Sequence, residues 1–217
     1  MQPFQRLMKA LGLMNEPAAE AVATPGLAPF LQRHPPAAGV KPATAEQLAR
    51  YADHLPAPLL ALWRQHGFGF YGRGLIQLID PDLYSENLWG WLMRDEPDME
   101  RLPIALSAMG TLFYYRRLSE DGDEDVSFLN PHTSESGCTV WSLEQFFNEW
   151  LDDPDNQVDH LHAETLDAMV AKAGVLERDQ MYFHEPALRL GGDGRLDGIA
   201  RGSAPVHLGL LLDLALG

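Results

Sequence analysis

The sequence has little cysteine and no long apolar run, and each absence excludes a class of protein. Cys138 is the only cysteine among 217 residues, so an internal disulfide and a four-cysteine zinc site are both excluded. This composition is typical of a reducing compartment, and we expect a cytoplasmic protein. The apolar stretch at residues 208–216 contains Asp213 and is far shorter than the roughly 20 residues that span a bilayer. We therefore expect no contact with a membrane.

Cations are scarce as well. The 16 Lys and Arg are outnumbered by 31 Asp and Glu, which gives a net charge of −15 at pH 7. Because nucleic-acid binding depends on cationic side chains that displace counterions from phosphates, we expect no direct binding of nucleic acid. High net charge is also found in disordered chains, but 46% hydrophobic residues, including five Trp and nine Phe, provide the apolar surface of a folded core.

The negative charge is concentrated in the second half of the chain. Residues 101–217 hold 8 basic and 20 acidic side chains, a net charge of −12, and residues 118–171 contain no Lys or Arg at all. Such a run can be a solvated face that keeps the protein soluble. It can equally be a docking surface for a basic partner, because clustered charge accelerates encounter with an opposite patch.

Residues 1–34 are predicted to form a helix followed by an arm. Residues 1–14 place Arg6 and Lys9 among apolar residues at helical spacing, which predicts a short amphipathic helix and lacks the apolar core of a signal peptide. Six prolines between residues 15 and 43 then predict a linker or a wrapping arm.

Apolar periodicity and turn residues predict an α+β protein with a mixed or antiparallel central sheet flanked by helices. The clearest helix covers residues 55–67, where Gly67 suits the C-terminal position. Asp80-Pro81 opens the next helix. Further helices are expected at residues 159–173 and 205–216, and strands at residues 74–79, 103–108, 112–115, 126–129, 137–141 and 187–190.

A helix start is also well marked at Ser142. Its hydroxyl can cap the amide of Gln145, whose side chain can reach back, while Trp141 and Phe146 have the spacing of a hydrophobic staple. We therefore expect Trp141 to pack on the helix that begins here.

No residue pattern specifies catalysis, a cofactor or a metal. Residues 67–72 read GxGxxG, but they follow a helix where the dinucleotide fingerprint follows a strand, so we interpret them as a helix stop and a turn. Asp121, Asp123 and Asp125 have the first spacings of a calcium loop, which then lacks its glycine and its final glutamate. Cys138 has no associated base and is expected to be a small buried thiol.

Several of these segments, taken together, resemble a known family. Residues 55–67 (LPAPLLALWRQHG) and 74–81 (GLIQLIDP), followed by Tyr84, resemble the GAD-like domain pattern of a helix LPxxLLxLWxxxG and a strand that ends in an Asn/Asp-Pro-x-x-Tyr turn. Residues 102–105 (LPIA) with Met109-Gly110 are similar to that family's PIA…FG hairpin, with Met in place of Phe.

The C-terminal part resembles the domain that accompanies GAD-like domains in immunity proteins of type VI secretion DNase effectors. The similar segments are residues 174–176, 179–183, 186–192 and 205–208. The whole resemblance spans about residues 35–216 and implies three parts: an N-terminal helix and arm (1–34), a GAD-like domain (35–135) and an immunity-type C-terminal domain (136–217), the last two either separate or one continuous globule.

The resemblance implies a bacterial cytoplasmic protein that binds and neutralises a cognate toxin and is not an enzyme. A nuclease is the toxin that suits the acidic stretch, because a nuclease presents cations to its substrate. We expect this partner, and not nucleic acid, to bind at the acidic loop of residues 120–125 and at the helix end of residues 152–155. The candidate partner-binding residues are Glu120, Asp121, Asp123, Glu124, Asp125, Asp152, Asp153 and Asp155.

Two other functions remain open from the sequence. In the first, the chain is an enzyme or ligand-binding domain whose pocket is lined by the GxGxxG-like turn, His132 and Cys138. In the second, it is a housekeeping scaffold of similar fold that has no toxin.

Overall fold

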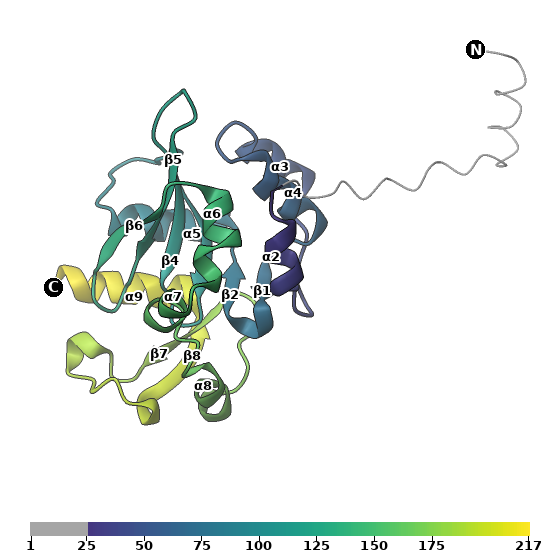
Figure 1. Ribbon diagram of the computed structural model, residues 1–217. Coiled ribbons are helices and arrows are strands. Elements are labelled where there is room, and N and C mark those ends of the chain that lie inside the picture. Colours follow the sequence, from purple (N-terminus) through teal and green to yellow (C-terminus); the bar gives the residue numbers. More distant parts are fainter. Residues whose placement is uncertain (1–25) are drawn as a thin grey trace, which may run out of the picture.

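A six-stranded antiparallel sheet is the centre of the computed structural model, which describes residues 26–217 (Figure 1). The strands follow one another in chain order across this sheet, and two further strands pair separately. The α+β class with an antiparallel sheet is therefore confirmed. The large sheet comprises β1 (Gly69–Tyr71), β2 (Ile76–Leu78), β3 (Arg101–Ser107), β4 (Leu112–Arg117), β5 (Glu124–Leu129) and β6 (Ser136–Val140), and the small one β7 (Gln180–His184) and β8 (Ile199–Ser203).

Helices cover both faces of the large sheet. The α-helices are α2 (Ala28–Arg33), α3 (Ala45–Tyr51), α4 (Ala57–Gln65), α5 (Pro81–Trp91), α6 (Leu143–Asn148), α7 (Pro154–Asp159), α8 (Leu166–Ala173) and α9 (Ala204–Leu216). Short 3-10 helices occur at Gly72–Gly74, Trp150–Asp152, Leu188–Leu190 and Leu196–Gly198. No helix among residues 26–217 is long and apolar enough to cross a membrane. The amphipathic helix predicted for residues 1–14 lies outside the described part of the chain.

The two faces of the sheet have separate cores because side chains alternate along each strand. In β4, Phe113 and Tyr115 point into a core shared with α2, α4 and α6. Leu112 and Tyr114, which alternate with them, point into a core shared with α5 and α9. The central strands are thus buried on both sides.

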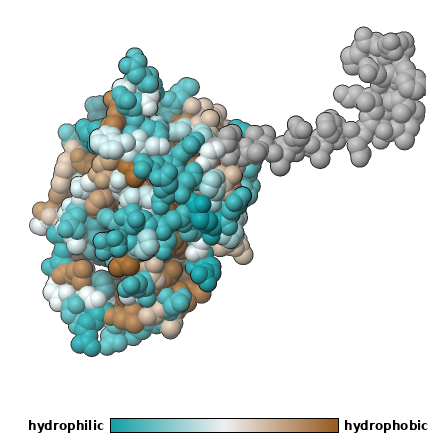
Figure 2. All heavy atoms as spheres, in the orientation of Figure 1, coloured by the Kyte–Doolittle hydropathy of each residue, from teal (hydrophilic) through white to brown (hydrophobic). Residues whose placement is uncertain are grey.

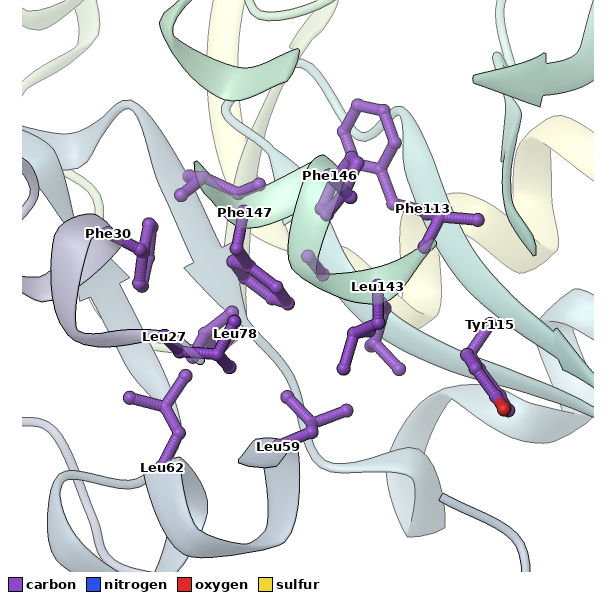
Figure 3. Close-up of a cluster of buried hydrophobic side chains, with 14 of the residues drawn as sticks. Leu27, Phe30, Leu59, Leu62, Leu78, Phe113, Tyr115, Leu143, Phe146 and Phe147 are labelled. Atoms are coloured by element: carbon purple, nitrogen blue, oxygen red, sulfur yellow. The ribbon is translucent and has the colours of Figure 1, made fainter. Parts of the chain in front are cut away.

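Aromatic side chains connect the elements around the core that the sheet shares with α2, α4 and α6 (Figure 3). The ring of Phe147 in α6 lies 4.9 Å, centroid to centroid, from that of Phe30 in α2, and Phe146 lies 5.2 Å from Phe113 in β4. The predicted arm of residues 1–34 therefore contributes a buried helix from residue 28 on. The large sheet also extends beyond residue 135, into β6.

Between residues 26 and 142 the predicted helices and strands are present, but two C-terminal predictions are wrong. The helix expected at residues 159–173 is broken by His162, whose φ of 56° is left-handed, so that only α8 remains of its second half. The strand expected at residues 187–190 is a 3-10 turn, closed by a 2.9 Å hydrogen bond from the amide of Leu190 to the carbonyl of Ala187. The strands of this region are β7 and β8 instead.

Gly67 ends α4 at a point where another segment passes against its backbone. Its φ is +96°, and a Cβ there would overlap the carbonyl oxygen of Lys41, whose residue bridges to Phe68. Gly122, in the loop between β4 and β5, has a φ of +95° and open space around it. The two glycines thus share a backbone conformation and differ in their surroundings.

We expect Gly67→Ala to destabilise the protein clearly more than Gly122→Ala. Gly122→Ala, the control, should lose only the roughly 1 kcal/mol of unfolding free energy that a left-handed conformation costs a residue with a side chain. Gly67→Ala must in addition displace the backbone at Lys41. Urea unfolding of both variants measures the difference. Equal losses of unfolding free energy would contradict the close approach.

Candidate functional site

The acidic loop forms the tip of the hairpin between β4 and β5. In Figure 1 it projects above the sheet, and Figure 2 shows this tip covered by hydrophilic side chains. Glu120 and Asp121 are exposed, and no hydrogen bond holds either carboxylate among the described residues. Asp123 is exposed too, but its carboxylate accepts a 2.9 Å hydrogen bond from the hydroxyl of Ser119, which closes the loop. The first two carboxylates are therefore the freest of the loop.

Asp125 belongs to the interior. Its side chain is fully buried and takes part in a two-point ion pair with Arg116 across the β4–β5 pairing, with Nε donating to Oδ1 at 2.8 Å and Nη2 donating to Oδ2. Ser127 donates a further hydrogen bond of 3.0 Å to Oδ1. This carboxylate is fully occupied within the protein. The calcium-loop spacing of Asp121, Asp123 and Asp125 therefore lacks its third ligand, and no group of three or more metal-ligating side chains is assembled within residues 26–217.

Glu124 connects the hairpin to α6. One of its carboxylate oxygens accepts a 2.9 Å hydrogen bond from the hydroxyl of Tyr115, and the other accepts a 2.8 Å bond from the amide of Leu143 at the start of α6. A carboxylate at a helix N-terminus satisfies an amide that has no partner within the helix. Glu124 thus has a structural role.

At the other end of α6, too, some carboxylates are engaged within the protein and others are free. Asp152 is paired with Arg33 and with His34, whose Nε2 lies 2.7 Å from Oδ1, and this pair holds α2 in place. Asp153 accepts hydrogen bonds from the amides of Asp155 and Asn156 and so caps α7. The carboxylate of Asp155 is exposed and free of such partners.

Helix α6 separates the two predicted clusters and adds acids of its own. Glu124 caps its start and Asp152 follows its end, so the two clusters lie at opposite ends of this helix. Between them, Glu144 on α6 and Glu149, directly after its last residue, are exposed. Both acids belong to the acidic stretch of the sequence but are not among the predicted partner-binding residues. Their spacing from the buried Phe146 and Phe147 indicates that they lie away from the core.

Trp141 is the most exposed large hydrophobic side chain near this surface. It is 70% exposed, so the staple predicted between Trp141 and Phe146 does not form. The hydroxyl of Ser142 does accept the predicted hydrogen bond from the amide of Gln145, at 3.3 Å. A large apolar side chain is therefore left in solvent beside the acidic hairpin.

The residues of the alternative pocket are not brought together. Gly69 and Phe70 line a groove of about 460 Å3 whose other wall is formed by α8 and Tyr182, and neither His132 nor Cys138 contributes to it. Cys138 is exposed on β6, which corrects the prediction of a buried thiol. Partial burial and the carboxylate of Asp125 raise the pKa of this thiol, which makes it a poorer nucleophile at neutral pH.

Three histidines gather where the loop after β5 meets the C-terminal segment. The rings of His132 and His184 lie 6.0 Å apart, and His162 and His184 line a small cavity of about 230 Å3. Burial lowers the pKa of all three below the usual value for histidine, and the neighbouring imidazoles lower those of His132 and His162 further. His132 Nε2 lies 2.9 Å from the carbonyl oxygen of Met109, so the neutral ring donates there.

Removal of the buried carboxylate tests its structural role. We expect Asp125→Asn to cost about 3–5 kcal/mol of unfolding free energy, because Arg116 then remains part-buried without a counter-charge. Asp121→Asn, in the exposed loop, should change stability by no more than about 0.5 kcal/mol. Urea unfolding at neutral pH measures both. A small loss for Asp125→Asn would return this residue to the candidate partner-binding set.

The histidines make stability depend on pH. Since their pKa values are lower in the folded than in the unfolded chain, unfolding takes up protons, and the stabilisation present above pH ~6.5 is lost as pH falls below it. We expect the unfolding free energy to fall by up to about 1.4 kcal/mol per pH unit for each proton taken up. His184→Gln should flatten this fall. Equal slopes in the variant and in the unmodified chain would contradict the assignment.

Comparisons with known proteins agree with this architecture. The family model of the GAD-like domain matches residues 26–121, which include α2, and the model of the C-terminal domain of the type VI secretion system immunity protein Tdi1 matches residues 142–215. No curated protein matches the sequence at a significant level.

A solved structure has the same fold. The crystal structure of Atu4351 from Agrobacterium tumefaciens is similar with a TM-score of 0.71 and 17% sequence identity, over 85% of this chain and 87% of that chain. At this identity the similarity is one of fold, whereas the match to the Tdi1 C-terminal domain indicates a type VI secretion immunity protein. The chain is thus a GAD-like domain protein that carries, after this domain, the C-terminal domain of the Tdi1 immunity family.

Proposed function

We propose that this chain protects a bacterium by binding a cognate type VI secretion toxin, and that the toxin is a nuclease whose cationic substrate surface it covers. The observation that carries the proposal is the match to the Tdi1 C-terminal domain, together with an acidic surface that begins at the hairpin tip before the matched segment and continues into it along α6 and α7. Inhibition then needs no catalytic residue in this chain. We place the encounter between this chain and the toxin in the cytoplasm, because a nuclease reaches DNA there.

The free carboxylates support a steering role for this surface. The exposed acids are Glu120 and Asp121 at the hairpin tip, Glu144 on α6, Glu149 directly after α6, and Asp155 on α7. Because no Lys or Arg occurs within residues 118–171, cations close to these acids come only from other segments. Clustered charge of one sign raises the association rate with an oppositely charged protein and disfavours similarly charged ones.

The remaining candidates contribute to the surface indirectly. Asp125 is committed to Arg116, and Asp152 to Arg33 and His34. Glu124 and Asp153 cap helices. We therefore narrow the partner-binding proposal to the carboxylates of Glu120, Asp121 and Asp155, with Asp123 beside them.

Charge reversal at the hairpin tip tests the steering. The double variant Glu120→Lys/Asp121→Lys should lower the association rate constant with the cognate effector by about tenfold or more at low ionic strength. The difference from the unmodified chain should shrink at 0.5 M salt, where charges on exposed surfaces are screened. Stopped-flow kinetics with a catalytically inactive effector measures this rate.

The matched control is Asp95→Lys/Glu96→Lys, which changes the net charge equally at an exposed loop between α5 and β3. If both double variants slow association equally, net charge and not this surface is responsible. If the unmodified chain neither binds the effector nor restores growth of cells that express its active form, the immunity function itself is refuted.

A further inference from the structure

The two edges of the large sheet differ. Beyond β1, residues 36–41 run alongside: Pro36 bridges to Tyr71 and Lys41 to Phe68, with backbone hydrogen bonds of 2.8 Å from Ala37 to Phe70 and from Lys41 to Phe68. This edge is covered. β6 forms the opposite edge, and among residues 26–217 its backbone pairs only with β5.

An uncovered edge strand presents unpaired amides and carbonyls, and proteins normally limit such edges because they accept strands from other chains. In β6, Ser136 and Cys138 are exposed. Figure 1 shows β6 at the border of the large sheet. The edge is therefore accessible to an extended segment of a partner.

Trp141 directly follows this edge. The pairing of Val126 with Val140 brings it beside the base of the acidic hairpin. Its 70% exposure is the largest of any large hydrophobic side chain in the described part of the chain. Trp is strongly enriched among the few residues that carry most of the binding energy in protein interfaces. An exposed Trp at the end of an open edge is thus positioned as an anchor.

The charge around the edge selects the kind of strand that it can accept. Exposed Glu135 precedes β6, and the acidic hairpin and Glu144 lie at its other end. Arg116, beside this region, is neutralised by Asp125, and Arg189 donates a hydrogen bond to the hydroxyl of Ser134. A strand with Lys or Arg near its ends is therefore electrostatically complementary.

From these observations we propose that the toxin docks by adding a basic β-strand to the free edge of β6, with Trp141 packing against its end. The inference rests on the proposed function and specifies how the partner is held. Strand addition derives affinity from main-chain hydrogen bonds, while side-chain positions and flanking charges provide specificity. The acidic hairpin then accelerates the encounter, and the edge and Trp141 hold the complex together.

The single native cysteine makes the edge directly observable. Because Cys138 lies exposed within β6 and is the only thiol of the chain, its alkylation by N-ethylmaleimide reports on coverage of this strand. We expect the rate to fall by at least about tenfold when the inactive effector is bound, since a paired and covered strand excludes the reagent. Hydrogen exchange of residues 136–140, followed by mass spectrometry, should slow in the same complex, because added strand pairing protects edge amides.

Trp141→Ala should weaken the complex by about 30-fold or more, as expected for a central interface residue, without loss of folding, because the side chain is mostly in solvent. The matched control is Leu210→Ala, an exposed apolar residue of α9 on the opposite face of the sheet, which should leave affinity unchanged. A complex that forms while Cys138 alkylation and amide exchange of β6 keep their free rates would overturn edge docking and leave the immunity function intact. If no complex forms, both proposals fall.

Discussion

The packing of α6 against the sheet is the constraint on which the rest of this structure depends. Phe147 contacts Phe30 of α2, and Phe146 lies between Phe113 of β4 and Trp150, with ring separations of 4.9–5.4 Å. Large aromatic pairs bury much apolar area and favour particular orientations. One short helix therefore connects the N-terminal segment, the central strand and the C-terminal segment, and its outer side holds exposed acids at a defined distance from the hairpin.

The acidic stretch combines two kinds of carboxylate that the sequence does not distinguish. Asp125 and Asp152 are paired with arginines from other segments, and Glu124 and Asp153 cap helices. Because these carboxylates are engaged by partners within the protein, they fix the scaffold. The long-range field arises from exposed acids at the hairpin tip and along α6 and α7. Stability and partner attraction are thereby divided between neighbouring residues of one segment.

The sheet has a comparable division between its edges. Residues 36–41 satisfy the backbone of β1, where the Gly67 conformation allows the close approach of Lys41. Nothing in the described chain does so for β6, and the partly open edge lies next to the acids and to Trp141. An arrangement in which charge, an aromatic side chain and free backbone meet at one border provides recognition without any catalytic group.

Local patterns in the sequence determined most of the secondary structure. The cap at Asp80, the stop at Gly67 and the hairpin between β3 and β4 depend on neighbouring residues and were predictable, as was the concentration of acids in residues 118–171. Contacts between distant segments decided the rest. Burial of Asp125 depends on Arg116 across a strand pair, exposure of Cys138 and Trp141 depends on β6 being an edge, and pairing of Asp152 depends on α2, more than a hundred residues earlier. Spacing along a chain specifies which residues can share a helix or strand, whereas only the folded structure specifies which charge is neutralised and which surface remains open.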